Sequence, residues 1–184
     1  MALAASKNAI GAVSELLKSQ LTVNTTATTV DIGRPEAASN TAGPKLNLFL
    51  YQVDVDGHLR NVPLDAGQAT PVWVVLHYLL TAFDADKDSD SIAAHSLLSE
   101  GMLALQELNF IEPTSAELRD NPEPLAVTFD ATDSELLSKV MQGTDERYRV
   151  SIGFQVRPVM IAPSTPPAYA LPVTTVGPPA DEGV

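Results

Sequence analysis

Apolar and polar residues alternate strictly along one segment in the last third of the chain, and this pattern constrains the fold more than any other. The apolar positions are Tyr148, Val150, Ile152, Phe154 and Val156. The positions beside them are Arg147, Arg149, Ser151, Gly153, Gln155 and Arg157. Successive side chains of a strand point to opposite faces of a sheet, so a period of two predicts a β-strand. We therefore expect a sheet with one face in the core and the arginines on the outward face.

Two other segments have the density of apolar residues expected of strands. Residues 46–53 alternate leucines with larger apolar side chains, so both faces of this strand should be at least partly covered. Residues 71–83 form a nearly continuous apolar run, which is typical of a central strand buried on both sides. Asp56 and Gly57 form a favoured tight-turn pair, which predicts a hairpin with residues 58–64 as its return strand.

Helical periodicity marks the start and the middle of the chain. Residues 10–17 repeat apolar side chains at helical spacing, and residues 91–108 do the same. The predicted stripe of the second helix is Ala94, Leu98, Met102, Leu105 and Leu108. A capping-box pattern predicts another helix over about residues 133–141. Shorter extended segments are expected at residues 22–32 and 127–129, where β-branched and aromatic residues are frequent.

The composition changes after Ile161, where the chain becomes rich in proline. The prolines of this last part are Pro163, Pro166, Pro167, Pro172, Pro178 and Pro179. With little left to bury, residues 163–184 are predicted to form a disordered, flexible tail behind a domain of residues 1–162. The alternation of strands and helices predicts an α/β fold of the α+β kind, with a single mixed, mainly antiparallel sheet flanked by helices.

Charge and composition exclude several classes of partner. The formal net charge is -12, which would repel a phosphate backbone, so we expect no nucleic-acid partner. The longest apolar run, residues 72–83, is shorter than the roughly 20 residues that a membrane-spanning helix needs, so no membrane span is expected. The chain has no cysteine, which excludes disulfides and thiol nucleophiles. Its first 20 residues lack the pattern of a secretory signal.

No motif for catalysis, cofactor binding or metal binding is complete. Four alternating aspartates resemble the first ligands of a calcium loop, but Ser89 replaces the required glycine and His95 the required glutamate. The three histidines lack zinc spacing, and no phosphate-binding or nucleophile-elbow motif is present. His77 or His58 with Asp65 could serve a small hydrolase only with a nucleophile that the sequence does not display. We expect no cofactor, no metal and no enzymatic activity.

Four stretches resemble a known family in their order and content. They are residues 46–53 with the following His58-Leu59-Arg60-Asn61, residues 76–83, the leucine-rich helix and the arginine-bearing strand. Together they resemble the tail-terminator, or cap, family of extracellular contractile injection systems, with an N-terminal domain of the Pvc16 type. The resemblance covers residues 8–162 and does not include the proline-rich tail.

The resemblance implies a structural subunit with a phage tail-terminator-like fold. Such subunits assemble as a sixfold ring that closes the baseplate-distal end of the inner tube and sheath and stops their polymerisation. The implied partners are further copies of the chain, the inner tube protein and the sheath protein. The implied location is the cytoplasm during assembly, followed by a phage-tail-like particle that can be released. The alternative in the same pathway is an assembly chaperone or adaptor.

Six residues are interface candidates for such a ring. Arg147, Arg149 and Arg157 share one predicted strand face, where planar guanidinium groups favour pairing with acidic groups of a partner. Pairing with acids of the same chain is the alternative for these arginines. Trp73 is expected either in the sheet core or as an interface anchor. His58 and Arg60 belong to the family-like stretch, and we expect its exposed residues to reach neighbouring subunits.

Overall fold

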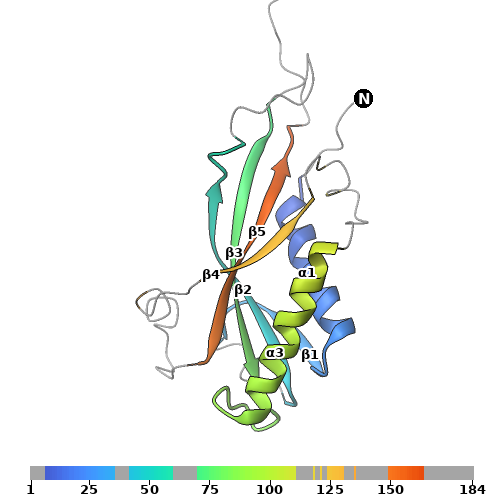
Figure 1. Ribbon diagram of the computed structural model, residues 1–184, viewed down its shortest axis with the longest axis vertical. Coiled ribbons are helices and arrows are strands. Elements are labelled where there is room, and N and C mark those ends of the chain that lie inside the picture. Colours follow the sequence, from blue (N-terminus) through green and yellow to red (C-terminus); the bar gives the residue numbers. More distant parts are fainter. Residues whose placement is uncertain are drawn as a thin grey trace, which may run out of the picture.

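In the described part of the chain, five strands form one open sheet that carries two helices on a single face (Figure 1). The computed structural model describes residues 7–35, 42–59, 70–110, 118, 121, 124–130, 135 and 149–163. The elements are α1 (Ala9–Asn24), β1 (Thr29–Ile32), β2 (Lys45–Val55), β3 (Val72–Phe83), α3 (Ile92–Glu107), η1 (Leu108–Phe110), β4 (Ala126–Asp130) and β5 (Ser151–Ile161). The predicted α+β class is confirmed.

The order of strands across the sheet is β1-β2-β3-β5-β4. Only β1 and β2 run parallel, and the other three pairs are antiparallel, so the prediction of a mixed, mainly antiparallel sheet is confirmed. The 12-residue β3 lies at the centre, where strands on both sides satisfy its backbone groups. Its nearly continuous apolar sequence fits this position, because both of its faces are buried.

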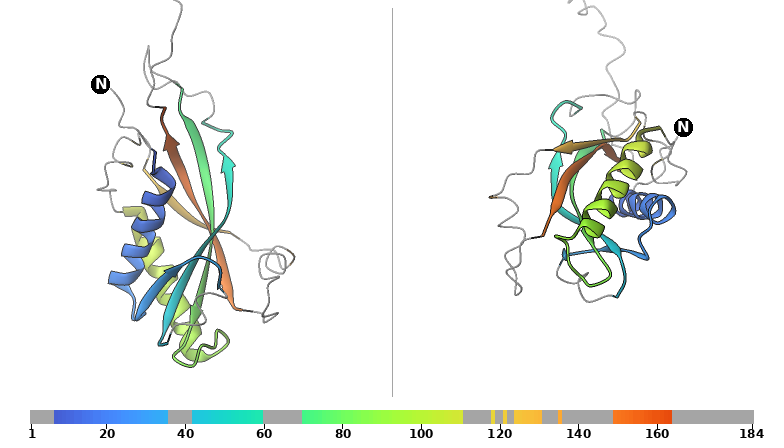
Figure 2. Two further views of the ribbon diagram at one scale, coloured as in Figure 1. Left: turned by 180° about the vertical axis from the view of Figure 1, so that it is seen from behind. Right: turned by 60° about the horizontal axis from the view of Figure 1, so that its bottom comes forward.

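Helices α1 and α3 lie side by side against the same face of the sheet, as the views of Figure 2 show. The side-chain Nε2 of Gln20 donates a hydrogen bond of 3.1 Å to the carbonyl of Ala104 and ties the two helices together. Gly101 lets α3 approach the strands closely. A Cβ at that position would lie only 3.0 Å from Leu80 and 3.3 Å from Leu46.

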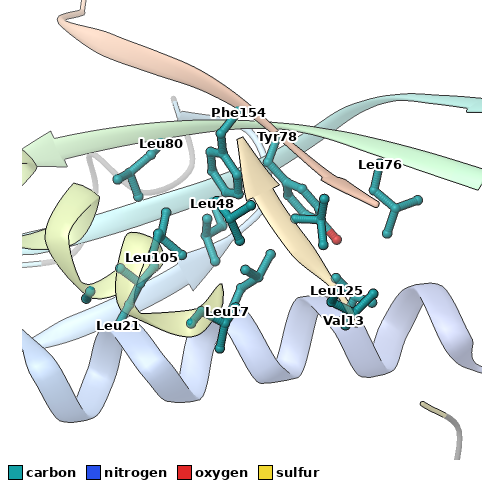
Figure 3. Close-up of a cluster of buried hydrophobic side chains, with 14 of the residues drawn as sticks. Val13, Leu17, Leu21, Leu48, Leu76, Tyr78, Leu80, Leu105, Leu125 and Phe154 are labelled. Carbon is teal, nitrogen blue, oxygen red and sulfur yellow. The ribbon is translucent and has the colours of Figure 1, made fainter. Parts of the chain in front are cut away.

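The core fills the space between the helices and the sheet (Figure 3). Its labelled members are Val13, Leu17, Leu21, Leu48, Leu76, Tyr78, Leu80, Leu105, Leu125 and Phe154. Each fully buried aliphatic side chain of this kind contributes about 1.5–3 kcal/mol through burial. The Tyr78 and Phe154 rings stack with centroids 5.5 Å apart, and the Tyr78 hydroxyl lies 2.8 Å from the Ser14 hydroxyl. The strand residues predicted to face the core, Phe154 and Val156, do so.

The start of α3 is set by a short acidic loop. The Ser91 hydroxyl accepts a hydrogen bond of 3.1 Å from the Ala94 backbone N–H, so Ser91 is the N-cap. The same hydroxyl donates to Asp84 at 2.6 Å. The other Asp84 oxygen accepts the backbone N–H groups of Asp86 and Asp88. These hydrogen bonds hold the pKa of Asp84 below its usual range.

Three boundaries differ from the sequence prediction. Residues 22–24 still belong to α1, so the extended segment begins only at Thr29. Residues 54 and 55 continue β2, whose antiparallel partner is β3, and His58 lies in a turn rather than in a return strand. The alternating strand was predicted at 147–157, but β5 runs from Ser151 to Ile161. It continues past Arg157 because a register shift lets Val159 pair with Val74.

Some predicted features lie outside the described residues. These are the rest of the return strand after Leu59, most of the helix over 133–141, and the tail beyond Pro163. Neither helix in the described part of the chain combines the length and the hydrophobicity needed to cross a membrane.

Candidate interaction surface

Arg149 is buried, contrary to the outward and exposed position expected from the alternation. Only 5% of its surface is exposed, and its guanidinium carbon lies 5.6 Å from the centroid of the Phe83 ring. The Lys45 ammonium lies 5.7 Å from the same centroid. Both cations are therefore within the range of a cation–π interaction with one ring. The strand face was assigned correctly as the one opposite Phe154, but other parts of the protein cover it at this end.

Burial also changes the acidity of groups at this covered face. Desolvation lowers the pKa of Lys45, and the nearby Asp31 carboxylate partly opposes that shift. Desolvation raises the pKa of Tyr51, with further contributions from Asp130 and Asp54. These shifts follow from the position of the residues in the sheet.

The remaining candidate cations and His58 are dispersed. Arg157 is exposed on β5, where it lies opposite Ala126 of β4. His58 is exposed in the turn after β2, and its backbone N–H donates to Asp56 at 2.9 Å. Arg60 and Arg147 lie outside the described residues. The structure therefore does not bring the three arginines of the sequence prediction together as one exposed row.

Trp73 occupies the core, which was one of its two predicted positions. It is 1% exposed and packs with Met160, Ala162 and the partly buried Leu59. Its indole N–H has no hydrogen-bond partner among the residues that the structure describes. A ring so deeply enclosed within the chain offers no surface for an incoming subunit.

His77 lies next to a carboxylate on the sheet face away from the helices. Its Nε2 is 3.1 Å from Asp54, and its ring centroid is 6.0 Å from that of Tyr51. The amide of Gln52 donates to the same Asp54 carboxylate at 2.7 Å. Within the described ranges, no serine or threonine hydroxyl is hydrogen-bonded to His77, and no three acidic or histidine side chains gather as a metal site. The arrangement is a polar cross-strand pair without a nucleophile.

An exposed apolar strip lies at the end of β2 and the start of β3. Val53, Val55 and Val72 are 44%, 61% and 49% exposed. Val55 lies opposite Val74, and Val72 is two residues before Val74, so the three valines share one face. Sequence reasoning missed this strip because it assigned residues 54 and 55 to a turn. The continued alternation of Val53 and Val55 was the signal that could have revealed it.

Two solved structures share this fold. One is the sheath/tube terminator of an extracellular contractile injection system, PVC, in its extended state, with a TM-score of 0.64 and 21% identity over 95% of this chain. The other is the tube-terminating cap of the anti-feeding prophage, with a TM-score of 0.62 and 19% identity over 90% of this chain. The present chain spans 64% and 59% of the length of those two chains.

A comparison with curated proteins finds no match. The model of the Pvc16 N-terminal domain family, in contrast, matches residues 10–175, which include both helices and the whole sheet. This match extends past the boundary at residue 162 that the composition predicted. The fold, the order of its elements and the match over most of the sequence agree, and the chain belongs to the Pvc16 N-terminal domain family.

Proposed function

We propose that this chain is a structural subunit that caps the tube and sheath of a contractile injection particle. Copies of the chain form a ring, with six subunits, on the end distal to the baseplate. The ring covers the last tube and sheath layers with a surface that does not accept another layer, and so ends polymerisation. The chain assembles in the cytoplasm and then remains in the particle, which can be released from the cell.

One observation is the main support for this proposal. A family match over residues 10–175 coincides with the fold of two proteins described as a sheath/tube terminator and a tube-terminating cap. The likeness covers nearly the whole of this chain, so it includes the sheet edges and the strand ends as well as the core. The partners we propose are therefore the inner tube protein, the sheath protein and further copies of the chain.

The chain acts by binding rather than by turnover. The His77–Asp54 pair is engaged across two strands, and the Asp84 carboxylate is occupied by donors of its own loop. Neither arrangement positions a nucleophile or an open coordination site. What the molecule offers instead is a rigid sheet with exposed strand ends, which suits contact with repeated subunits.

Electron microscopy of purified particles tests the proposal. With an epitope tag on this chain, antibody should label one end of each particle, and averaged ends should show a ring with sixfold symmetry. In a strain that lacks the gene, tube and sheath lengths should become heterogeneous, and the wild-type gene supplied in trans should restore a uniform length. Gene deletion of an unrelated cytoplasmic protein serves as the control for particle yield.

Other locations of the chain would overturn the proposal. A chain that is present in the cell extract but absent from purified particles would indicate an assembly chaperone. Label along the whole shaft, or at the baseplate, would exclude a cap. A purified chain that turned over a substrate would contradict the structural role.

A further inference from the structure

The backbone groups at the two outer edges of the sheet differ in what pairs with them. At the β4 edge, the Asn109 side chain donates to the Val127 carbonyl at 3.2 Å and accepts from the Val127 N–H at 2.5 Å. At Val127 this amide takes the place of a neighbouring strand and satisfies the backbone groups that point away from β5. Covering an edge in this way prevents another chain from adding to it.

Among the residues that the structure describes, no strand or side chain covers the β2 edge over its second half in this way. Strand β1 pairs only with Lys45–Leu48, and the last contact is the Gly33 N–H on the Leu48 carbonyl at 2.9 Å. From residue 49 to residue 55, β3 is the single strand paired with β2 in the described part of the chain. The register shift between Leu50 and Gln52 leaves residues 52–55 as a regular stretch opposite residues 74–77. A regular, unpaired edge is a template for an added strand.

The side chains of residues 52–55 determine which kind of segment can pair with this edge. Val53 and Val55 on one face are 44% and 61% exposed, while Gln52 and Asp54 are exposed on the other. An added strand of about four residues would cover the valines with an apolar side chain. An acidic segment would meet Asp54 with like charge, so an uncharged, β-branched segment is favoured.

The chain itself contains one segment of this chemistry in its proline-rich part. Val173-Thr174-Thr175-Val176 is a run of four β-branched, uncharged residues between Pro172 and Gly177. Strand β5 ends at Ile161, which lies opposite Val72, so the chain continues from the same end of the sheet as the open edge. The residues from Ala162 to Val173 span up to about 35 Å when extended, several times the spacing of about 4.8 Å between strands.

We propose that residues 173–176 of one copy add as a strand to residues 52–55 of the next copy. This inference rests on the ring proposed above, because one patch contacting a different patch on the neighbour is the type of contact that closes a ring. The strand supplies main-chain hydrogen bonds to the edge and covers the exposed valines. It also gives the proline-rich segment a role as a link between subunits.

Disulfide crosslinking tests the pairing, because the natural chain has no cysteine. A Val53→Cys chain is co-expressed with a differently tagged chain that carries one cysteine at position 173, 174, 175 or 176, and a mild oxidant is added. Side chains on one face of paired strands are close enough for a disulfide, and those on the other face are not. We expect two alternate tail positions to crosslink and the other two to remain free.

The control replaces Val53→Cys by Ala93→Cys, at an exposed position on α3. Paired strands hold their cysteines at a high effective concentration, so the alternate positions should crosslink at least about tenfold more than this control. The double substitution Thr174→Pro and Thr175→Pro in the tail, with cysteine at position 173 or 176, should reduce the crosslink to the control level, because proline cannot donate to a strand ladder. Equal yields at all four tail positions, or yields no higher than the control, would overturn the pairing.

A second experiment distinguishes a tail segment that pairs with the next copy from one that pairs with the edge of its own chain. A chain with Val53→Cys and the best tail cysteine together should form crosslinked oligomers. A crosslink found only within single chains would show that each copy covers its own edge, and would overturn the exchange. If the crosslinks form but the chain is absent from particle ends, the cap proposal fails while the pairing stands. If a cap ring forms without these crosslinks, the pairing fails while the cap proposal stands.

Discussion

Arg149 and Lys45 show that the environment of a residue, rather than its place in an alternating pattern, decides what it does. Both are cations on the sheet face opposite the helices, and both are buried beside the Phe83 ring. Removing them from water is costly, and the contact with the π-face offsets part of that cost. Arg157, on the same strand as the alternating segment, stays exposed. Among the described arginines of the predicted row, only this one remains available to a partner.

Tyr78 provides a test of core energetics at the level of one atom. Tyr78→Phe removes the hydroxyl that lies 2.8 Å from Ser14 but keeps the ring stacked on Phe154. Ser14 retains its bond to the Ile10 carbonyl, so we expect a loss of about 0.5–1.5 kcal/mol in the free energy of unfolding at neutral pH. Urea denaturation followed by circular dichroism measures this change. A loss above about 3 kcal/mol would show that the ring has moved.

The same substitution changes the response to alkali. Burial raises the pKa of Tyr78 in the folded state, so the unfolded chain loses this proton first, at a pH of about 10. The stabilisation is present in full below that pH and is lost as the pH rises through the folded-state pKa. Stability measured between about pH 8 and 12 should fall less steeply in Tyr78→Phe than in the natural chain. Tyr51→Phe, at a partly exposed site, should change the slope less.

At the level of elements, the lengths of neighbouring strands determine which edges are exposed. The four residues of β1 cannot cover the 11 residues of β2, so the second half of β2 is left at the edge. At the other side, β4 is also short, but Asn109 from η1 satisfies the backbone groups of Val127, its second residue. Val127 at one edge is thus covered by a side chain, whereas no strand in the described ranges pairs with the outer side of the second half of β2.

Asn109→Ala tests whether the amide protects the β4 edge. The change removes two hydrogen bonds and leaves the buried Val127 with unsatisfied backbone groups, which should cost about 1–3 kcal/mol. We also expect more aggregation on heating, measured by light scattering, because the edge becomes available to other chains. Gln106→Ala, an exposed neighbour on α3, is the control and should have little effect. Unchanged stability in Asn109→Ala would contradict the protective role.

Ser91→Ala tests how α3 begins. Loss of the cap to the Ala94 N–H should lower the free energy of unfolding by about 1 kcal/mol. Ser91 also donates to Asp84, and this bond is the largest cause of the lowered pKa of Asp84. A lowered carboxyl pKa stabilises the fold above the unfolded pKa and loses this effect as the pH falls, so the variant should be less sensitive to acid. Ser91→Thr should retain the cap, and Ser96→Ala on the exposed face should be neutral.

For the whole molecule, charge opposes self-association. Each copy carries a formal charge of -12, so the copies would repel one another in the proposed six-subunit ring. Salt screens this repulsion, and the assembled fraction should therefore increase between about 20 mM and 500 mM NaCl. Analytical ultracentrifugation should show a species of six times 19.5 kDa growing at the expense of the monomer. A ring that dissociates with salt would instead indicate that ion pairs, such as those of Arg157, dominate the contact.

Most of the architecture could be read from local pattern, and the family from the resemblance of four stretches to it. The apolar run of β3, the helical periods of α1 and α3 and the alternation in β5 each depend on neighbours along the chain, and these four elements are present. Boundaries were less predictable, because Thr22–Asn24 are β-branched or polar yet remain in α1, where Thr22 and Asn24 bond back to carbonyls one turn earlier. The candidate interface was the least predictable part.

The sequence by itself determined where the main strands and helices lie, though not their bounds, as well as the absence of cysteine chemistry and the acidic net charge. Those properties follow from residue type and from spacing along the chain. Only the tertiary structure decided that Arg149 and Trp73 are enclosed, that Asn109 closes one edge, and that β2 extends beyond β1. The physical reason is that burial and edge exposure depend on which strands become neighbours across the sheet, and distant parts of the chain meet there only after folding.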